Sequence, residues 1–184
     1  GTSWSTAKSF YAALVGISLD KGEIDSLDDP VAKYVPQYDE GKKKNITIRQ
    51  ILNMTSGLEF PSHEHEMMFF EADHLAYAYK VDVENKPGEV FQYNNVNSML
   101  MGEILKGATG KTAKQLIEER LFSKIGLKNY TAWEDEAGNT LTYCCLDMSA
   151  RDYSRFGLLF SRDGNWNGDQ VISKNYVDES LKLY

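Results

Sequence analysis

The chain has 184 residues, of which 42% are apolar and 26% are charged, and this globular balance excludes a disordered chain. The net charge of −7 disfavours nucleic acid or an anionic membrane as the main partner. No apolar run reaches the roughly 18 residues that a membrane-spanning helix needs. The length suits one domain over residues 1–184.

Apolar residues at helical spacing predict a mainly helical chain. Most helix starts carry a Ser, Thr or Asn that can cap the first turn, and three of them match a capping box, namely Thr47 with Gln50, Thr112 with Gln115 and Ser149 with Asp152. The predicted helices cover residues 5–19, a short turn at 28–30, Thr47 to just before Gly57, Asn94 or Asn95 to near Gly107 and Gly110, Thr112 through Leu121, Ser149 through Phe160, and Ser173 through Leu181, with Tyr176, Val177 and Leu181 inward.

Extended structure is sparse. Asp163-Gly164 and Asn167-Gly168 predict turns of a small hairpin. Short extended pieces are expected only at residues 46–48, 90–91 and 171–172, so a full central sheet is not encoded. Residues 59–84 lack a clean period, and we expect a partly helical excursion near the candidate site.

The two cysteines, Cys144 and Cys145, are adjacent. A disulfide between neighbours is strained, and two thiols do not make a four-ligand metal framework. We therefore expect two buried, small apolar side chains without a bond between them.

The tetrad Ser5-Thr6-Ala7-Lys8 lies at the start of the first predicted helix. Residues three apart share a helix face, so the Lys8 amine can reach the Ser5 hydroxyl. A serine needs a neighbouring base to become nucleophilic, and a lysine can serve if burial lowers its pKa. By itself this spacing also fits a solvated lysine one turn after a capping serine.

The triplet Tyr93-Asn94-Asn95 follows the Pro87-Gly88 turn, and Tyr93 lies 88 residues after Ser5. With the tetrad, it resembles the serine β-lactamase and penicillin-binding protein family, especially the branch of class C β-lactamases, esterases, D-aminopeptidases and aminohexanoate-dimer hydrolases. Further segments resemble the family in its own order: residues 27–31, 34–36, 46–52, 55–58, 148–157 and 164–168.

The resemblance implies a role for each matching residue. Ser5 would attack a carbonyl and become acylated, and its backbone N–H would be one oxyanion donor. Lys8 would share in activating Ser5, and Tyr93 would act as general base or proton relay in acylation and deacylation. Asn95 would hydrogen-bond a substrate amide. Taken alone, Tyr93 also fits a packed aromatic residue and Asn95 a helix cap.

The resemblance also implies an α/β fold of the β-lactamase and DD-peptidase type. This chain would supply mainly its helical subdomain and nucleophile helix, with the central strands largely missing. The family's K-T-G or H-x-G strand motif does not occur in these residues, and we expect a fragment of a larger domain. Met54 replaces a histidine that many relatives carry, which we interpret as a difference between branches.

The predicted chemistry is acyl transfer through an acyl-serine on an ester, amide, D-amino-acid peptide or β-lactam, without a metal or organic cofactor. A small linear amide or ester is the first choice. The alternative is a non-catalytic or sensor-type penicillin-binding module. His63, Glu64 and His65, with His74 further on, lack the spacing of a metal site and predict a polar loop. Periplasmic or extracellular location is favoured by the resemblance, with the cytoplasm left open.

Overall fold

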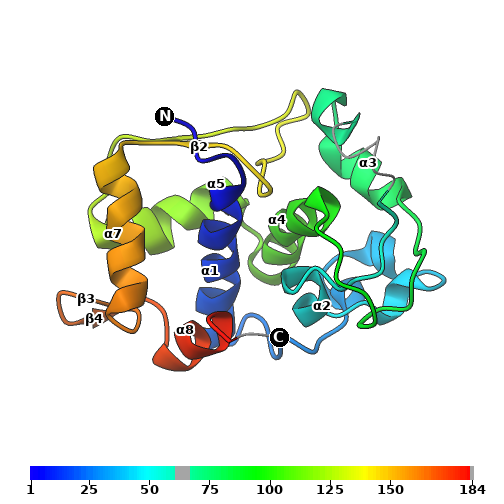
Figure 1. Cartoon of the computed structure of the whole chain (residues 1–184), viewed down its shortest axis with the longest axis horizontal. Coiled ribbons are helices and arrows are strands. Elements are labelled where there is room, and N and C mark those ends of the chain that lie inside the picture. The colour runs from blue at the N-terminus through cyan, green and yellow to red at the C-terminus, as the bar shows by residue number, and fades with distance from the viewer. Residues whose placement is uncertain (61–66, 183–184) are drawn as a thin grey trace.

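The computed structural model describes residues 1–60 and 67–182. Helices dominate this part of the chain (Figure 1). The α-helices are α1 (Ala7–Asp20), α2 (Ile48–Leu52), α3 (His74–Lys80), α4 (Asn95–Thr109), α5 (Ala113–Leu116), α6 (Ser123–Ile125), α7 (Ala150–Ser161) and α8 (Lys174–Ser180). Short 3-10 turns are η1 (Trp4–Thr6), η2 (Val31–Lys33), η3 (Pro36–Tyr38), η4 (Lys43–Asn45) and η5 (Met67–Phe70), and η6 (Ile117–Phe122) is a π-helical segment.

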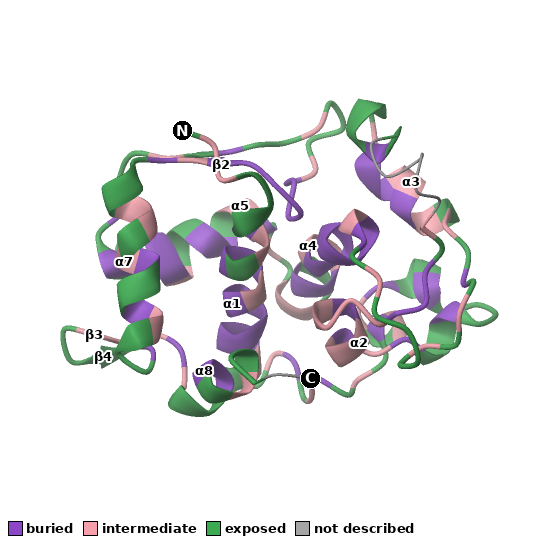
Figure 2. Ribbon diagram, viewed as in Figure 1, coloured by how far each residue is buried: buried purple, intermediate pink, exposed green. Residues whose placement is uncertain are grey.

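The central element is α1, which packs against α4 on one side and η6 on another (Figure 1). Nearly every residue from Phe10 to Ser18 is buried, whereas Ser5 at its N-terminal end is exposed (Figure 2). The Phe10 ring stacks on Phe156 of α7 at 3.9 Å and meets Phe122 of η6 edge-on at 5.9 Å. Burial of such aromatic side chains dominates core energetics, so α1 is fixed from several sides.

Strands are short and paired locally. The strands β1 (Thr131–Ala132) and β2 (Leu146–Asp147) form one antiparallel pair, and β3 (Asn165–Trp166) and β4 (Asp169–Gln170) form the other. The second pair is the predicted hairpin. Asn167 and Gly168 both have positive φ, as a tight two-residue hairpin turn requires.

Most helix starts agree with the sequence. Reciprocal capping boxes cap the N-terminus of α2 at Thr47 and that of α5 at Thr112. The Asn94 side chain accepts from Val96 N–H at the start of α4. The expected partly helical excursion contains η5 and α3, although residues 61–66, with His63, Glu64 and His65, lie outside the described part.

Several local predictions are wrong. The Ser149 side chain accepts from Asp152 N–H, but the Asp152 carboxylate bonds to the Ser149 hydroxyl, so no reciprocal box forms. Pro30 is extended and precedes η2 instead of opening it. Residues 90–91 and 171–172 join no strand.

Two predictions on side chains also fail. Leu181 follows α8 and is 66% exposed, because the helix ends at Ser180 and its apolar stripe ends with Tyr176 and Val177. Cys144 and Cys145 are buried as expected, but they form a disulfide with each other. The bond occurs together with an uncommon backbone conformation, since Cys145 has a left-handed φ of 76°.

Candidate active site

Ser5 lies in η1, which runs directly into α1. Trp4 before it has a φ of 47°, a left-handed conformation that turns the chain sharply into the helix. Ser5 is therefore presented at the helix N-terminus, where free N–H groups and the helix dipole favour negative charge. An oxyanion formed beside Ser5 would be stabilised by this position.

The Lys8 amine lies 3.1 Å from the Ser5 hydroxyl oxygen, as the three-residue spacing predicts. It also donates to the Tyr143 carbonyl oxygen at 2.7 Å. Burial is the largest influence on this amine and lowers the pKa of Lys8, while its hydrogen bond and charge interaction with Tyr93 act in the opposite direction. A neutral Lys8 can donate to the Tyr143 carbonyl and still offer its lone pair to Ser5.

Tyr93 also lies beside this amine, with the Lys8 nitrogen 4.9 Å from the centre of the Tyr93 ring. Its side chain is 41% exposed and therefore open to a ligand. Asn95, the first residue of α4, is half-buried. The structure thus brings Ser5, Lys8 and Tyr93 into one cluster and places Asn95 two residues from it along the chain.

The Tyr93 segment is anchored to the loop that follows α2. Gln92 N–H donates to the Met54 carbonyl oxygen at 2.8 Å, and the Asn94 side-chain amide donates to the Glu59 carbonyl oxygen at 3.1 Å. Gly57 in this loop has a φ of 74°, and a Cβ there would lie 2.1 Å from Asn85 O. The loop that follows α2 therefore holds the residues on both sides of Tyr93 through the carbonyl oxygens of Met54 and Glu59.

Residues 143–146, which we call the anchor strip, were missed by the sequence analysis. Its Tyr143 carbonyl holds Lys8, while Cys145 N–H donates to the Trp4 carbonyl oxygen at 3.3 Å. Leu146 exchanges two bonds with Ser3: Ser3 N–H donates to Leu146 O at 2.8 Å, and Leu146 N–H donates to Ser3 Oγ at 2.9 Å. The strip holds the backbone before the nucleophile and the amine after it. No local pattern reveals this, since the contacts are made by backbone atoms from about 140 residues away.

Tyr143 has a second partner in His74. The two side chains lie 3.1 Å apart, from the Tyr143 hydroxyl to His74 Nδ1, and both residues are buried. Burial lowers the pKa of His74, and the neutral ring can accept from Tyr143. Of the four residues considered as metal ligands from the sequence, only His74 lies in the part of the chain that the structure describes. It lies at the start of α3 and contacts the anchor strip through the Tyr143 hydroxyl.

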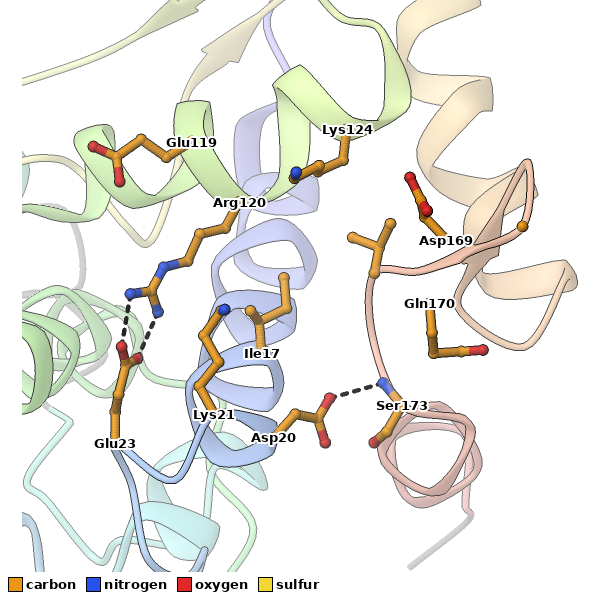
Figure 3. Close-up of a pocket in the computed structure, with 12 residues that line it drawn as sticks. Ile17, Asp20, Lys21, Glu23, Glu119, Arg120, Lys124, Asp169, Gln170 and Ser173 are labelled. Atoms are coloured by element: carbon orange, nitrogen blue, oxygen red, sulfur yellow. Dashed lines mark hydrogen bonds and ion pairs between the residues drawn. The ribbon is translucent and has the colours of Figure 1, made fainter.

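A separate open pocket lies elsewhere in the described part of the chain. It measures about 980 Å³ and is lined by Asp20 and Lys21 at the C-terminal end of α1, roughly 20 Å along the helix from Ser5 (Figure 3). Some of its charged groups are paired: Arg120 binds both carboxylate oxygens of Glu23, and Asp20 accepts from Ser173 N–H (Figure 3). Lys21, Lys124 and Asp169 also line this pocket. The candidate site is the Ser5 cluster, because a serine hydroxyl and a partly desolvated lysine amine lie 3.1 Å apart there.

Comparison of the sequence with protein families finds one whose profile, described as Beta-lactamase, matches residues 2–175. Protein flp of Staphylococcus aureus (strain MW2) is 27% identical over 134 residues, which are 69% of this chain and 27% of that protein. Beta-lactamase-like protein 2 of Dictyostelium discoideum is 25% identical over an alignment of 195 positions, gaps included, which covers 98% of this chain and 32% of that protein.

Solved structures share the fold. A Bacillus anthracis protein, provisionally assigned as a 6-aminohexanoate-dimer hydrolase, superposes with a TM-score of 0.86 at 24% identity, over 95% of this chain and 51% of its own. A D-stereospecific amidohydrolase from Streptomyces sp. superposes at 0.75 with 22% identity, over 97% of this chain and 64% of its own. The chain thus spans about half of the first structure and less than a third of the curated relatives' length.

Proposed function

Because this chain belongs to the Beta-lactamase family, we propose that it carries the nucleophile of a serine hydrolase that works through an acyl-serine. The observation that carries the proposal is the Lys8 amine, which lies 3.1 Å from Ser5 Oγ, is partly desolvated and is directed by the Tyr143 carbonyl. Such a pair of nucleophile and oriented base is what covalent catalysis by serine requires.

In the proposed first step, Ser5 Oγ attacks the carbonyl carbon of the substrate, and its proton passes to Lys8 or Tyr93. The bond to the leaving amine or alkoxide breaks, and the leaving group takes that proton. Water then attacks the acyl-serine and gives one proton to the same base. The carboxylic acid departs, and Ser5 regains its hydrogen.

Two further groups have proposed roles in this reaction. The Ser5 backbone N–H, at the helix start, is a donor to the oxyanion. Asn95 hydrogen-bonds an amide of the substrate. The Ser5 cluster faces solvent, which suits a small-molecule substrate. We propose a small linear amide or ester as the first substrate class, in line with the aminohexanoate-dimer and D-amidohydrolase assignments of the structural relatives, and a D-amino-acid peptide or β-lactam as the second.

The test is intact-mass spectrometry of the full-length protein after treatment with a fluorophosphonate, together with turnover of p-nitrophenyl esters. We expect one adduct, which is lost in Ser5→Ala and retained in Ser9→Ala, a matched exposed serine one turn further along α1. Removal of a catalytic nucleophile lowers turnover by several orders of magnitude.

Well-folded protein that forms no adduct and turns over no ester would contradict the hydrolase. It would favour the non-catalytic binding module in its place. A single stable adduct with labelled penicillin, without turnover, would favour a sensor that acylates once.

A further inference from the structure

The Cys144–Cys145 disulfide lies at the centre of the anchor strip. One residue before it, the Tyr143 carbonyl oxygen accepts from the Lys8 amine at 2.7 Å. One residue after it, Leu146 makes two hydrogen bonds with Ser3. The backbone of Cys145 itself binds Trp4, the residue before the nucleophile. These anchors of Ser3, Trp4 and Lys8 therefore all belong to the disulfide residues or their immediate neighbours, while Gly1 is bonded further along the chain, to Met148.

The bond between adjacent cysteines closes a small ring that includes the peptide bond between them. Such a ring restricts the backbone torsions on either side of that peptide. Cys145 has a φ of 76°, in the left-handed region that residues with a Cβ seldom adopt. Without the ring, Cys145 is free to return to negative φ. That rotation would turn its N–H away from Trp4 O and shift the groups of Tyr143 and Leu146 that hold Lys8 and Ser3.

We propose that the Cys144–Cys145 disulfide is a positioning element of this site, which keeps Ser5 and Lys8 aligned, and that its reduction slows acylation of Ser5. The inference rests on the acyl-serine chemistry proposed above. The two cysteines touch no substrate in this account and act through the backbone of the anchor strip.

Reduction by a dithiol such as dithiothreitol is balanced as a two-electron exchange. The S–S bond breaks, Cys144 and Cys145 each gain a hydrogen, and the reductant closes to its own cyclic disulfide. The protein gains about 2 Da, which intact-mass spectrometry detects. Oxidised glutathione reverses the change by taking up the same two electrons and two protons.

The experiment measures phosphonylation of Ser5 by a fluorophosphonate, which uses the same attack by the serine oxygen as acylation and releases fluoride. It compares the oxidised and reduced forms of the full-length protein, each verified by mass. Reagent concentration is varied to separate the maximal rate of Ser5 modification from the half-saturating concentration. We expect the maximal rate to fall by about 10-fold on reduction, because small misplacements of reacting groups are costly. The half-saturating concentration should stay within about twofold, since reagent binding does not use the anchor strip. Reoxidation should restore the rate.

Variants separate positioning from general structural damage. Cys144→Ser/Cys145→Ser should be slow in both conditions and indifferent to dithiothreitol, which controls for disulfides elsewhere in the full-length protein. Cys145→Gly should be modified faster than Cys145→Ser, because glycine adopts positive φ without a Cβ penalty. Thermal unfolding midpoints identify any variant that fails to fold, and the reduced wild-type protein then carries the test.

Three outcomes would overturn the inference. One is an unchanged rate of Ser5 modification in protein whose mass shows two thiols, and another is a double variant that still responds to dithiothreitol. The third is the failure of oxidised glutathione to re-form the bond between the Cys144 and Cys145 thiols in reduced protein. In these cases Ser5 still forms its adduct, so the hydrolase stands. If oxidised protein forms no adduct at Ser5, the proposed function falls and this inference falls with it.

Discussion

The Lys8 amine is the residue-scale feature on which the chemistry depends. Burial favours its neutral form, and a neutral amine can take a proton from Ser5. Tyr93 opposes this effect, because its hydrogen bond and its charge both favour the protonated amine. The pKa of Lys8 thus depends on desolvation, which lowers it, and on Tyr93, which raises it. Removing the Tyr93 hydroxyl oxygen should therefore lower this pKa further.

Tyr93→Phe should shift the acid limb of the acylation profile to lower pH. Removing the hydroxyl leaves burial unopposed, so the pKa of Lys8 falls further and the neutral amine persists in more acidic solution. The maximal rate should also fall, because a proposed proton relay is lost. The measurement is the rate at which a p-nitrophenyl ester acylates the protein, followed as release of p-nitrophenol from pH 5 to pH 10. An unmoved limb would show that the Lys8 amine does not set it.

At the scale of elements, α1 determines where Ser5, the proposed nucleophile, lies. Its position depends on close approach of α8, where the Tyr176 hydroxyl donates to the Ala12 carbonyl oxygen at 2.6 Å. A Cβ on Gly16 would lie only 2.2 Å from the Tyr176 ring. The glycine is therefore required by helix packing, although its backbone is ordinary helix.

Gly16→Ala should lower the free energy of unfolding by about 1–3 kcal/mol, because the Tyr176 ring is buried and tied by its hydroxyl. Gly157→Ala on α7 is the matched control. A Cβ there meets nothing within 4 Å, so alanine should stabilise the helix by about 0.5–1 kcal/mol. Urea unfolding of both variants measures the difference. Equal effects would show that helix propensity, not the α1–α8 contact, decides the stability at Gly16.

At the scale of the whole molecule, the segment between β1 and β2 connects distant parts of the chain. It runs across one edge of the molecule to α3 and returns to the start of α1 (Figure 1). At its far end, the Asp135 carboxylate accepts from His74 N–H at 2.9 Å, and at its return the Tyr143 hydroxyl meets the His74 ring. Contacts at α3 are thereby linked to the anchor strip beside Ser5.

This link should make the protein sensitive to acid. His74 has a lowered pKa when folded, so the unfolded chain binds its proton first as the pH falls. The stabilisation is complete above the ordinary histidine pKa of about 6.5 and is lost as the pH falls from there through the lowered folded pKa, by at most about 1.4 kcal/mol per pH unit. His74→Gln should flatten the dependence of the unfolding free energy on pH between 7 and 5. A wild-type protein equally stable at both ends of this range would contradict the prediction.

The sequence by itself determined the features that depend on neighbours within one helical turn. The predicted capping boxes form at the N-termini of two helices, between Thr47 and Gln50 and between Thr112 and Gln115. The three-residue spacing of Ser5 and Lys8 allows their 3.1 Å contact. The family and its fold, predicted from the tetrad and the Tyr93 triplet, are confirmed by the profile match and the structural likeness. The catalytic roles of Ser5, Lys8, Tyr93 and Asn95 remain predictions.

Only the tertiary structure decided how the site is supported. The anchor strip holds Lys8 and Trp4 through backbone atoms, and backbone groups are the same in every residue, so no sequence pattern marks them. The Cys144–Cys145 bond occurs together with a positive φ at Cys145, a conformation that local preference disfavours and that the sequence does not announce. Leu181 was assigned inward by periodicity, but α8 ends before reaching it. Local spacing therefore identified the reacting groups, while long-range packing determined what holds them.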